Sequence, residues 1–204
     1  AGMIAAIVVF GVYGAAYDDI FEVKHCCIDD TENLRKLRGA KYSESKLENT
    51  YCDIQMRLKQ EQKVLFSGTP CQVAGLKSFL NKEYDNLFCV DFICHGVPSP
   101  MVWKAYIDYR SKIDADGKMP TEINLRSKNT GWSRYQYSNV FHYESEGQIT
   151  IKNGKSLFMN LFIGDYVSRP LCENCNFKGY GRVSDITIGD FWGIKNVFPE
   201  FVDN

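Results

Sequence analysis

Cys71 stands at a point where the pattern of the chain changes. The stretch SGTPCQVAGL, residues 67–76, follows the apolar residues Val-Leu-Phe. Thr69 is a good N-cap residue and Pro70 is favoured at the first helical position, so the stretch predicts a strand followed by a helix. Cys71 then lies in the first helical turn, where free N–H groups and the helix dipole stabilise a thiolate. A thiolate binds metals or attacks electrophiles; the alternative is a buried, unreactive cysteine.

A second apolar run ends in a similar way. In VDFICHGVPSP, residues 90–100, Asp91 stands inside the run, and Cys94 and His95 follow it. Sites in open parallel sheets form beyond the carboxyl ends of the strands. If the two strands are neighbours, Cys71 and Cys94 emerge at the same edge of the sheet. A single histidine such as His95 is more often a satisfied structural group than a ligand.

The third reactive stretch is RPLCENCNFKGYGRVSDITIGDFWG, in which Cys172 and Cys175 form a C-x-x-C pair. Such a pair fits half of a zinc knuckle, part of an iron–sulfur site or a redox couple. No strand leads this pair into a helix, which weakens the redox interpretation. Together with Cys71 and Cys94 the pair completes four thiols, enough for zinc or for a cluster. The spacing does not choose between these metals.

The other cysteines have a simpler interpretation. Cys52 falls in a predicted helix and Cys89 in a predicted strand, where each packs as a small apolar residue. Cys26 and Cys27 are adjacent at the end of a predicted strand, and sequence neighbours rarely ligate one compact centre. The chain has eight cysteines and no secretory signal, which predicts a reducing compartment and a cytoplasmic protein.

A loop between two predicted helices, LRGAKYSES at residues 37–45, collects another set of functional groups. Gly39 and Lys41 are suited to holding a phosphate, while Tyr42 can lie against a flat ring. The same composition is also typical of a solvated turn. The loop alone does not decide between these two possibilities.

The composition excludes several classes of protein. The chain has 204 residues, 45% hydrophobic residues and a net charge of -1, with no clustered basic face for nucleic acid. Its first 17 residues are uncharged, but a membrane span needs ~20 apolar residues and a signal peptide needs a basic start. We therefore expect a buried strand with a turn at Gly11 and Gly14, and no membrane insertion. Both ends look cut from a longer protein.

The elements that position these residues fall into two regions, 1–113 and 114–204, which are either separate or one continuous domain. The first alternates between strands and amphipathic helices, which predicts a largely parallel sheet with crossover helices. Its strands are expected at 4–13, 21–25, 63–67 and 87–92, and its helices at 31–38, 46–60, 72–80 and 100–110. In the second region, antiparallel strands at 121–126, 135–143 and 148–151 precede a helix at 157–163, the cysteine loop and a strand at 185–188. The predicted class is mixed α/β.

These stretches together resemble a known family. They resemble the coenzyme F420 hydrogenase/dehydrogenase beta-subunit family, in which similar stretches occur in the same order. In chain order the stretches are LRGAKYSES, FSGTPCQVAGLKSFL, VDFICHGVPSP and RPLCENCNFKGYGRVSDITIGDFWGI. The resemblance covers nearly the whole chain. It implies an iron–sulfur flavoprotein oxidoreductase that transfers electrons between a 4Fe–4S cluster, FAD and a hydride acceptor such as coenzyme F420. Relatives often carry an additional ferredoxin-like segment with a dense run of cysteines, which this chain does not show.

The resemblance also implies roles for individual residues. The metal ligands would be Cys71, Cys94, Cys172 and Cys175. The flavin site would be lined by Gly39, Lys41, Tyr42, Ser67, Gly68, Thr69 and Gln72. In this hypothesis Lys41 stabilises negative charge on the cofactor and His95 relays a proton.

The implied partners are an electron-donor or acceptor protein, either a ferredoxin-like domain or a hydrogenase or dehydrogenase subunit, and a small-molecule hydride acceptor. Two other functions use the same four cysteines. One is a non-catalytic zinc module, and the other is an electron relay without flavin. Metal and flavin content distinguishes all three.

Overall fold

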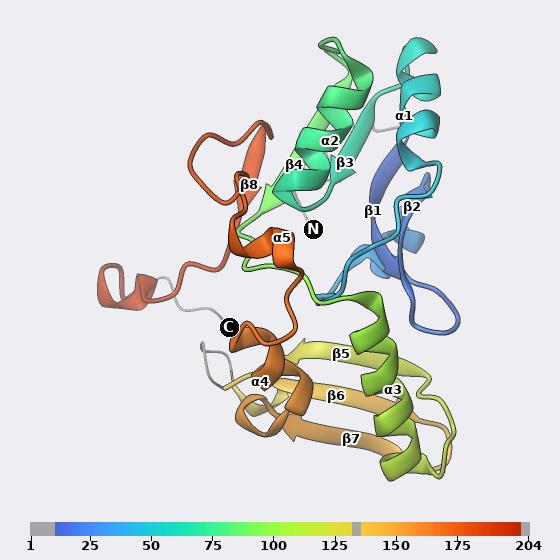
Figure 1. Ribbon diagram of the computed structural model, residues 1–204, viewed down its shortest axis with the longest axis vertical. Coiled ribbons are helices and arrows are strands. Elements are labelled where there is room, and N and C mark those ends of the chain that lie inside the picture. The colour runs from blue at the N-terminus through green and yellow to red at the C-terminus, as the bar shows by residue number, and fades with distance from the viewer. Residues whose placement is uncertain (1–10, 132–135, 201–204) are drawn as a thin grey trace. The chain divides into compact units, whose positions relative to one another are not determined.

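A computed structural model describes residues 11–131 and 136–200 of the chain. The chain forms two compact units, which are described separately (Figure 1). The first unit contains the described residues of 1–96 together with 169–188, and the second those of 97–168 and 189–204. Most of the strand expected at residues 4–13 lies outside the described residues.

The first unit is built on a five-stranded sheet with the order β2-β1-β3-β4-β8. β1, β3, β4 and β8 run parallel to one another, and β2 pairs antiparallel with β1. The strands are β1 (Gly11–Tyr17), β2 (Val23–Ile28), β3 (Val64–Ser67), β4 (Leu87–Phe92) and β8 (Ile186–Ile188). The mostly parallel sheet confirms the predicted architecture of this region.

Two helices, α1 (Thr50–Lys59) and α2 (Pro70–Leu80), bury their apolar sides against this sheet. Figure 1 shows α2 running along β3 and β4. Fully burying one Leu or Val side chain contributes about 1.5–3 kcal/mol, so this cluster stabilises the unit and fixes where α2 begins. The buried residues of the cluster are Tyr13, Ile54, Leu58, Val64, Phe66, Val73, Leu76, Leu80 and Cys89.

Two glycines of the first strand have a packing role. Gly11 and Gly14 lie inside β1, so the turn predicted there is wrong. A Cβ on Gly11 would lie 3.2 Å from Arg57 Nη1 and from Cys27 Sγ, and a Cβ on Gly14 would lie 3.2 Å from Leu37 Cδ1. These glycines therefore allow close packing across a strand rather than a change of chain direction.

The chain between β1 and α1 differs from the expectation in three respects. β2 extends to Ile28, so Cys26 and Cys27 lie inside an antiparallel strand rather than at a strand end. The helix expected at 31–38 is a short 3-10 helix, η2 (Asn33–Leu37). α1 begins at Thr50 rather than at residue 46, because the backbone of Lys46 bonds to β2 through His25 N–H and Val23 O, both at 2.9 Å. Cross-strand pairing has thus overridden local helix propensity.

The second unit pairs a three-stranded antiparallel sheet with helices α3 (Pro100–Ala115) and α4 (Leu157–Ile163). Its strands are β5 (Glu122–Ser127), β6 (Ser138–Tyr143) and β7 (Gly147–Lys152). The Tyr106 ring of α3 lies 5.2 Å from the Phe158 ring of α4 and 6.1 Å from the Phe141 ring of β6. Such aromatic contacts bury large apolar area and hold the two helices on the sheet. Short 3-10 helices η3 (Lys128–Thr130), η4 (Asn153–Lys155) and η5 (Ile194–Asn196) complete this unit.

The division between the units differs from the expected boundary after residue 113, which falls within α3. The cysteine-bearing segment returns to the first unit because β8 pairs with β4. The mixed α/β class, with one mostly parallel and one antiparallel sheet, is confirmed. None of the helices in the described part of the chain has the length and apolar character needed to cross a membrane.

His25 predicts an acid-sensitive stability of the first unit. Its ring stacks on Phe66 at 5.2 Å, and burial lowers its pKa, while the Ser67 carbonyl 3.0 Å from Nε2 opposes that shift. The unfolded state therefore binds a proton more readily than the folded state. As pH falls below about 6.5, we expect the free energy of unfolding to fall by up to about 1.4 kcal/mol per pH unit. Urea unfolding between pH 5 and 8 measures this slope.

The variant His25→Gln should lack most of this slope. His95→Gln is the matched control, because His95 is exposed and its replacement leaves the buried imidazole in place. Equal slopes in the protein and in His25→Gln would contradict the prediction.

Candidate functional site

The four predicted ligand cysteines all belong to the first unit. Cys71 lies in the first turn of α2 and is exposed, and Cys94 follows β4 and is partly buried. β3 and β4 are parallel neighbours, so Cys71 and Cys94 follow strands that end at one edge of the sheet. Cys172 lies in α5 (Pro170–Glu173), and Cys175 follows that helix. The structure thus delivers thiols from two neighbouring strand ends and from the cysteine loop.

Burial and neighbouring thiols both favour the protonated form of Cys94. The pKa of Cys94 is raised to about 11, mainly by burial and also by the thiols of Cys71, Cys172 and Cys175, while a backbone hydrogen bond with Gly96 lowers it. Within residues 11–131 and 136–200, however, no group of three or more Cys, His, Asp or Glu side chains gathers closely enough to hold a single metal ion. Among the described residues, the thiols are therefore not arranged around a single metal ion.

The two candidate centres require different distances between the four sulfur atoms. Four sulfurs bonded to one zinc at about 2.3 Å stand about 3.8 Å apart. In a four-iron cluster each iron binds one thiolate, so the four sulfurs stand farther apart around a larger body. Four thiols in one unit are the donor set that either centre uses.

Hydrogen-bonding groups lie close to two of these sulfur atoms. Thr69 Oγ1 lies 3.1 Å from Cys71 Sγ, and the Phe177 N–H donates to Cys175 Sγ at 3.4 Å. Donors to sulfur stabilise a thiolate, the form that binds metal. Cys94 Sγ instead lies 4.0 Å from the Gly96 carbonyl, a contact in which the thiol donates. Because its pKa is raised, Cys94 holds its proton more firmly than an ordinary thiol and must lose it on binding metal.

Gln72 joins two stretches that sequence reasoning assigned to one site. Its Oε1 accepts from the Thr69 N–H at 3.0 Å, and its Nε2 donates to Ser45 Oγ at 2.9 Å. The loop at 37–45 is therefore tied to the start of α2. Both ends of the Gln72 amide are engaged within the protein, so its established contacts are structural.

A second tie was missed by sequence reasoning. Glu44 forms an ion pair with Arg169, which directly precedes α5. The two residues are 125 positions apart, and both stand in polar stretches that give no signal of pairing. Through this ion pair, the loop at 37–45 also contacts the start of the cysteine segment.

Several groups around these loops fit a ligand. Gly39 has φ +82° and nothing within 4 Å of its Cβ position, so the backbone there is open to close approach. Ser43 Oγ and His25 Nδ1 are buried polar atoms without a hydrogen-bond partner among the described residues. Buried polar groups normally have partners, so such atoms are suited to a bound molecule. This observation supports the expected cofactor site at the loop.

Other predicted flavin residues are explained by the fold. A Cβ on Gly68 would lie 2.9 Å from Phe66 Cε1 and 3.1 Å from Gln72 Oε1, so Gly68 is required by packing rather than by an open approach to a ligand. The Ser67 carbonyl contacts His25 Nε2. Tyr42 is partly buried. Burial is the main cause that raises the pKa of Tyr17, and the nearby Tyr42 raises it further.

Lys41 has the electrostatic character of a functional amine. Its Nζ donates to the Arg38 carbonyl at 2.8 Å and to the Gly39 carbonyl at 3.2 Å, and it lies 5.6 Å from the centre of the Tyr17 ring. Burial lowers the pKa of Lys41 to about 8, and the nearby Cys26 thiol opposes that shift. The amine therefore changes its charge close to neutral pH, as is typical of functional lysines.

Comparison with known proteins agrees with these observations. Residues 61–200 match the family that describes the C terminus of the coenzyme F420 hydrogenase/dehydrogenase beta subunit. The chain belongs to this family. The match confirms the resemblance seen in the sequence and includes all four cysteines of the candidate site. Gly39, Lys41 and Tyr42 lie outside the matched residues.

The solved structures that match this chain include one with low sequence identity. It is the xenon-derivatised F420-reducing [NiFe] hydrogenase complex from Methanosarcina barkeri, with 15% identity and a TM-score of 0.48. The match covers 82% of this chain and 54% of that chain, so this chain spans about half the length of the protein it matches. No curated protein matches the sequence.

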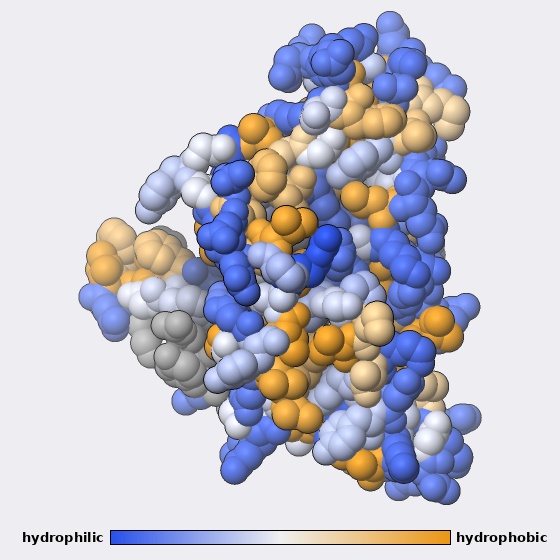
Figure 2. All heavy atoms as spheres, in the orientation of Figure 1, coloured by the Kyte–Doolittle hydropathy of each residue, from blue (hydrophilic) through white to orange (hydrophobic). Residues whose placement is uncertain are grey.

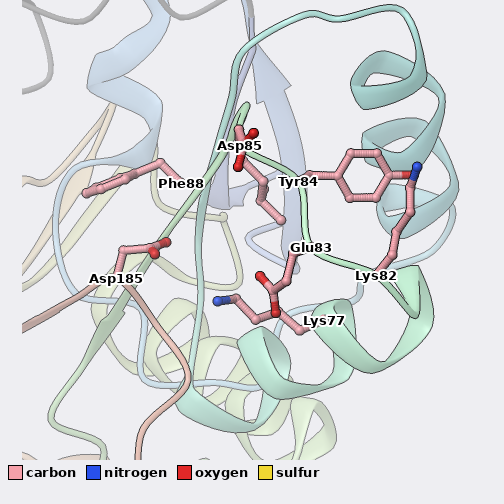
Figure 3. A pocket seen from close by; sticks show the side chains of 8 residues that line it. Lys77, Lys82, Glu83, Tyr84, Asp85, Phe88 and Asp185 are labelled. Atoms are coloured by element: carbon pink, nitrogen blue, oxygen red, sulfur yellow. The ribbon is translucent and has the colours of Figure 1, made fainter.

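A pocket of about 310 Å³ lies elsewhere in this family member (Figure 3). It is formed beside the α2–β4 connection, at the amino ends of β4 and β8, whereas Cys71 and Cys94 follow carboxyl ends of strands. Acidic and basic side chains line it together, and none of the predicted site residues is among them. The lining residues are Lys77, Lys82, Glu83, Tyr84, Asp85, Leu87, Phe88 and Asp185. This pocket is therefore separate from the candidate site.

The lowered pKa of Lys41 predicts a stability that rises with pH. Because the folded pKa is about 8 and the unfolded value about 10.4, the buried charge costs stability below pH 8 and this cost disappears as the pH rises. We expect Lys41→Met to raise the free energy of unfolding at pH 7 by about 2 kcal/mol, allowing for partial exposure. Unfolding curves at pH 7 and 9.5 check the sign. Lys59→Met, at an exposed position of α1, should show no such pH-dependent gain.

Removing the Gln72 side chain should loosen both loops. Gln72→Ala leaves the Thr69 N–H and Ser45 Oγ without these partners, which costs about 1–3 kcal/mol. Hydrogen exchange should become faster at amides of residues 39–45, because their tie to α2 is lost. Gln55→Ala, which removes one contact to Lys59 on the surface of α1, is the control and should change neither quantity by more than about 0.5 kcal/mol. Unchanged exchange in Gln72→Ala would show that the tie is dispensable.

Proposed function

We propose that this protein is an iron–sulfur flavoprotein oxidoreductase subunit, which transfers electrons between a 4Fe–4S cluster, FAD and a hydride acceptor such as coenzyme F420 or an analogous carrier. The observation that carries the proposal is that one unit contains all four thiols. The parallel strands β3 and β4 lead to Cys71 and Cys94, and the β4–β8 pairing returns the loop with Cys172 and Cys175 to the same unit. The family supports an electron-transfer role of the F420 hydrogenase/dehydrogenase beta-subunit type.

In this proposal the four cysteines hold the cluster as thiolates. Cys71 lies in the first turn of α2, and Cys175 Sγ accepts a hydrogen bond from the Phe177 N–H. Cys94 must be deprotonated against its raised pKa, so cluster binding would release a proton there. A cluster supplies one-electron steps and a flavin supplies hydride transfer.

The loop at 37–45 and the start of α2 would hold FAD. Gly39 offers an open backbone, while Ser43 Oγ and His25 Nδ1 offer buried polar atoms for a bound molecule. Tyr42, Ser67, Gly68, Thr69 and Gln72 complete the proposed lining. Of these, Gly68 and Gln72 act mainly by holding the loops in place, because their own contacts are within the protein.

Two residues have proposed catalytic roles. Lys41 would place positive charge beside the cofactor, and its pKa of about 8 means that this charge responds to a neighbouring negative group. A developing negative charge would favour the protonated amine and be stabilised by it. His95 is exposed after β4, next to Cys94, and its proposed role is to relay a proton.

A protein partner would deliver or remove the electrons, either a ferredoxin-like domain or another subunit of a hydrogenase or dehydrogenase. Figure 2 shows hydrophobic atoms at the surface around α5. Three apolar residues of the first unit are more than half exposed: Ile93, Leu171 and Ile188. Ile93 is next to Cys94 and Leu171 is next to Cys172, while Ile188 lies on β8, the strand that follows the cysteine loop. Exposed apolar residues close to a redox centre are suited to a protein contact.

The cluster assignment predicts the effect of removing the C-x-x-C pair. In full-length protein prepared without oxygen, Cys172→Ser with Cys175→Ser should lose most of its iron, acid-labile sulfide and visible absorbance, because two of four ligands are gone. The matched control is Cys26→Ser with Cys52→Ser, which changes two other thiols and should keep all three signals. Unchanged iron and sulfide in the first variant would contradict the assignment.

The same preparations separate the alternatives. Yellow flavin released by acid supports the FAD assignment, and iron without flavin would instead identify an electron relay. One zinc per chain without iron or colour would replace the proposal with a structural zinc module.

A further inference from the structure

Asp91 is a carboxylate inside an otherwise apolar strand. Its residue is 1% exposed, and it lies on β4 three positions before Cys94. A buried carboxylate is unfavourable unless it is paired. Its partner is Arg182 of the cysteine loop, whose Nη1 lies 3.2 Å from Asp91 Oδ2 and whose side chain is itself only 11% exposed. The fold therefore buries one ion pair between the strand and the loop.

The guanidinium of Arg182 contacts both sides of this junction. Its Nη1 also donates to the Phe92 carbonyl of β4 at 3.1 Å, and its Nη2 donates to the Lys178 carbonyl at 3.3 Å. Phe92 lies two positions before Cys94, and Lys178 lies three positions after Cys175. One planar group thus spans from the strand that leads to Cys94 to the turn that follows Cys175.

Other contacts fix the two ends of the loop. At one end Arg169 pairs with Glu44, and at the other Asp185 accepts from the Cys89 N–H at 2.6 Å. Among residues 170–183 of the described chain, Arg182 alone has a hydrogen bond or ion pair to β4. The other Asp91 oxygen, Oδ1, is buried without a hydrogen-bond partner among the described residues. The carboxylate therefore depends on Arg182, and through the Lys178 carbonyl the same guanidinium links the turn after Cys175 to β4.

We propose that Asp91 and Arg182 are a positioning pair that holds the cysteine loop against β4, so that Cys172 and Cys175 face Cys94 before any metal binds. The inference rests on the proposed function only in treating these cysteines as one set of ligands. Asp91 orients the guanidinium, and the guanidinium holds the backbone on both sides of the loop junction. The pair acts through the cysteines and does not itself contact the metal.

Thiol crosslinking in the metal-free full-length protein tests the pair directly. Dibromobimane joins two nearby thiols, and mass spectrometry of the digested protein identifies which cysteines are joined. In the parent protein we expect crosslinks from Cys94 to Cys172 or Cys175. The double variant Asp91→Asn with Arg182→Met removes both charges, so no unpaired buried charge remains to unfold the unit. In it these crosslinks should fall at least fivefold, while those between Cys71 and Cys94 persist.

The control is a second ion pair with similar burial. Arg110 and Asp114 of α3, in the second unit, have side-chain exposures of 12% and 9%. The double variant Arg110→Met with Asp114→Asn should leave all crosslinks from Cys94 unchanged. An equal loss in this control would show that any weakened ion pair has the same effect and would overturn the inference.

A conservative variant keeps the test decisive if the double variant does not fold. Arg182→Lys retains the charge but not the planar contact to two carbonyls, so amides at residues 171–183 should exchange faster than in the parent protein. Unchanged exchange in Arg182→Lys, or unchanged crosslinks in a folded double variant, would overturn the positioning role. If the crosslinks depend on Arg182 but the protein contains no iron, the proposed function is contradicted and the positioning role of the pair still holds.

Discussion

Parallel pairing between β3 and β4 is the interaction on which the candidate site depends. Because the two strands run in one direction, the segments that follow them emerge at one edge of the sheet. One segment carries Cys71 at the start of α2 and the other carries Cys94. The β4–β8 pairing then brings the cysteine loop back to the same unit, although the chain has meanwhile formed most of the second unit.

Desolvation shapes the chemistry of the groups at this edge. It raises the pKa of Cys94, lowers that of Lys41 and requires a cation beside Asp91. In each case burial disfavours the charged form, and the structure responds differently. Cys94 stays a thiol, Lys41 becomes a weaker base, and Asp91 acquires the Arg182 guanidinium. A metal cation would reverse the balance at Cys94, because it stabilises the thiolate that burial opposes.

The signature stretches of the family serve the fold as well as the site. Gly68 gives room to the Phe66 ring, and Gln72 holds the start of α2 to Ser45. These residues would be kept for packing even without a ligand, so their presence in a motif does not by itself assign them to binding. Gly39 and Ser43 differ from them, because one is open and the other is buried without a described partner.

The sequence by itself determined the elements whose signals are local. The strand at 87–92 and the helix at 157–163 were predicted at their observed bounds, since apolar periodicity over a few residues defines them. It also identified the thiols and, through the resemblance, the family. Only the tertiary structure decided that β1 and β2 pair antiparallel and that Arg182 meets Asp91, 91 positions away. Such contacts depend on which surfaces pack together, and polar residues far apart in the chain carry no periodic pattern that reveals their partners.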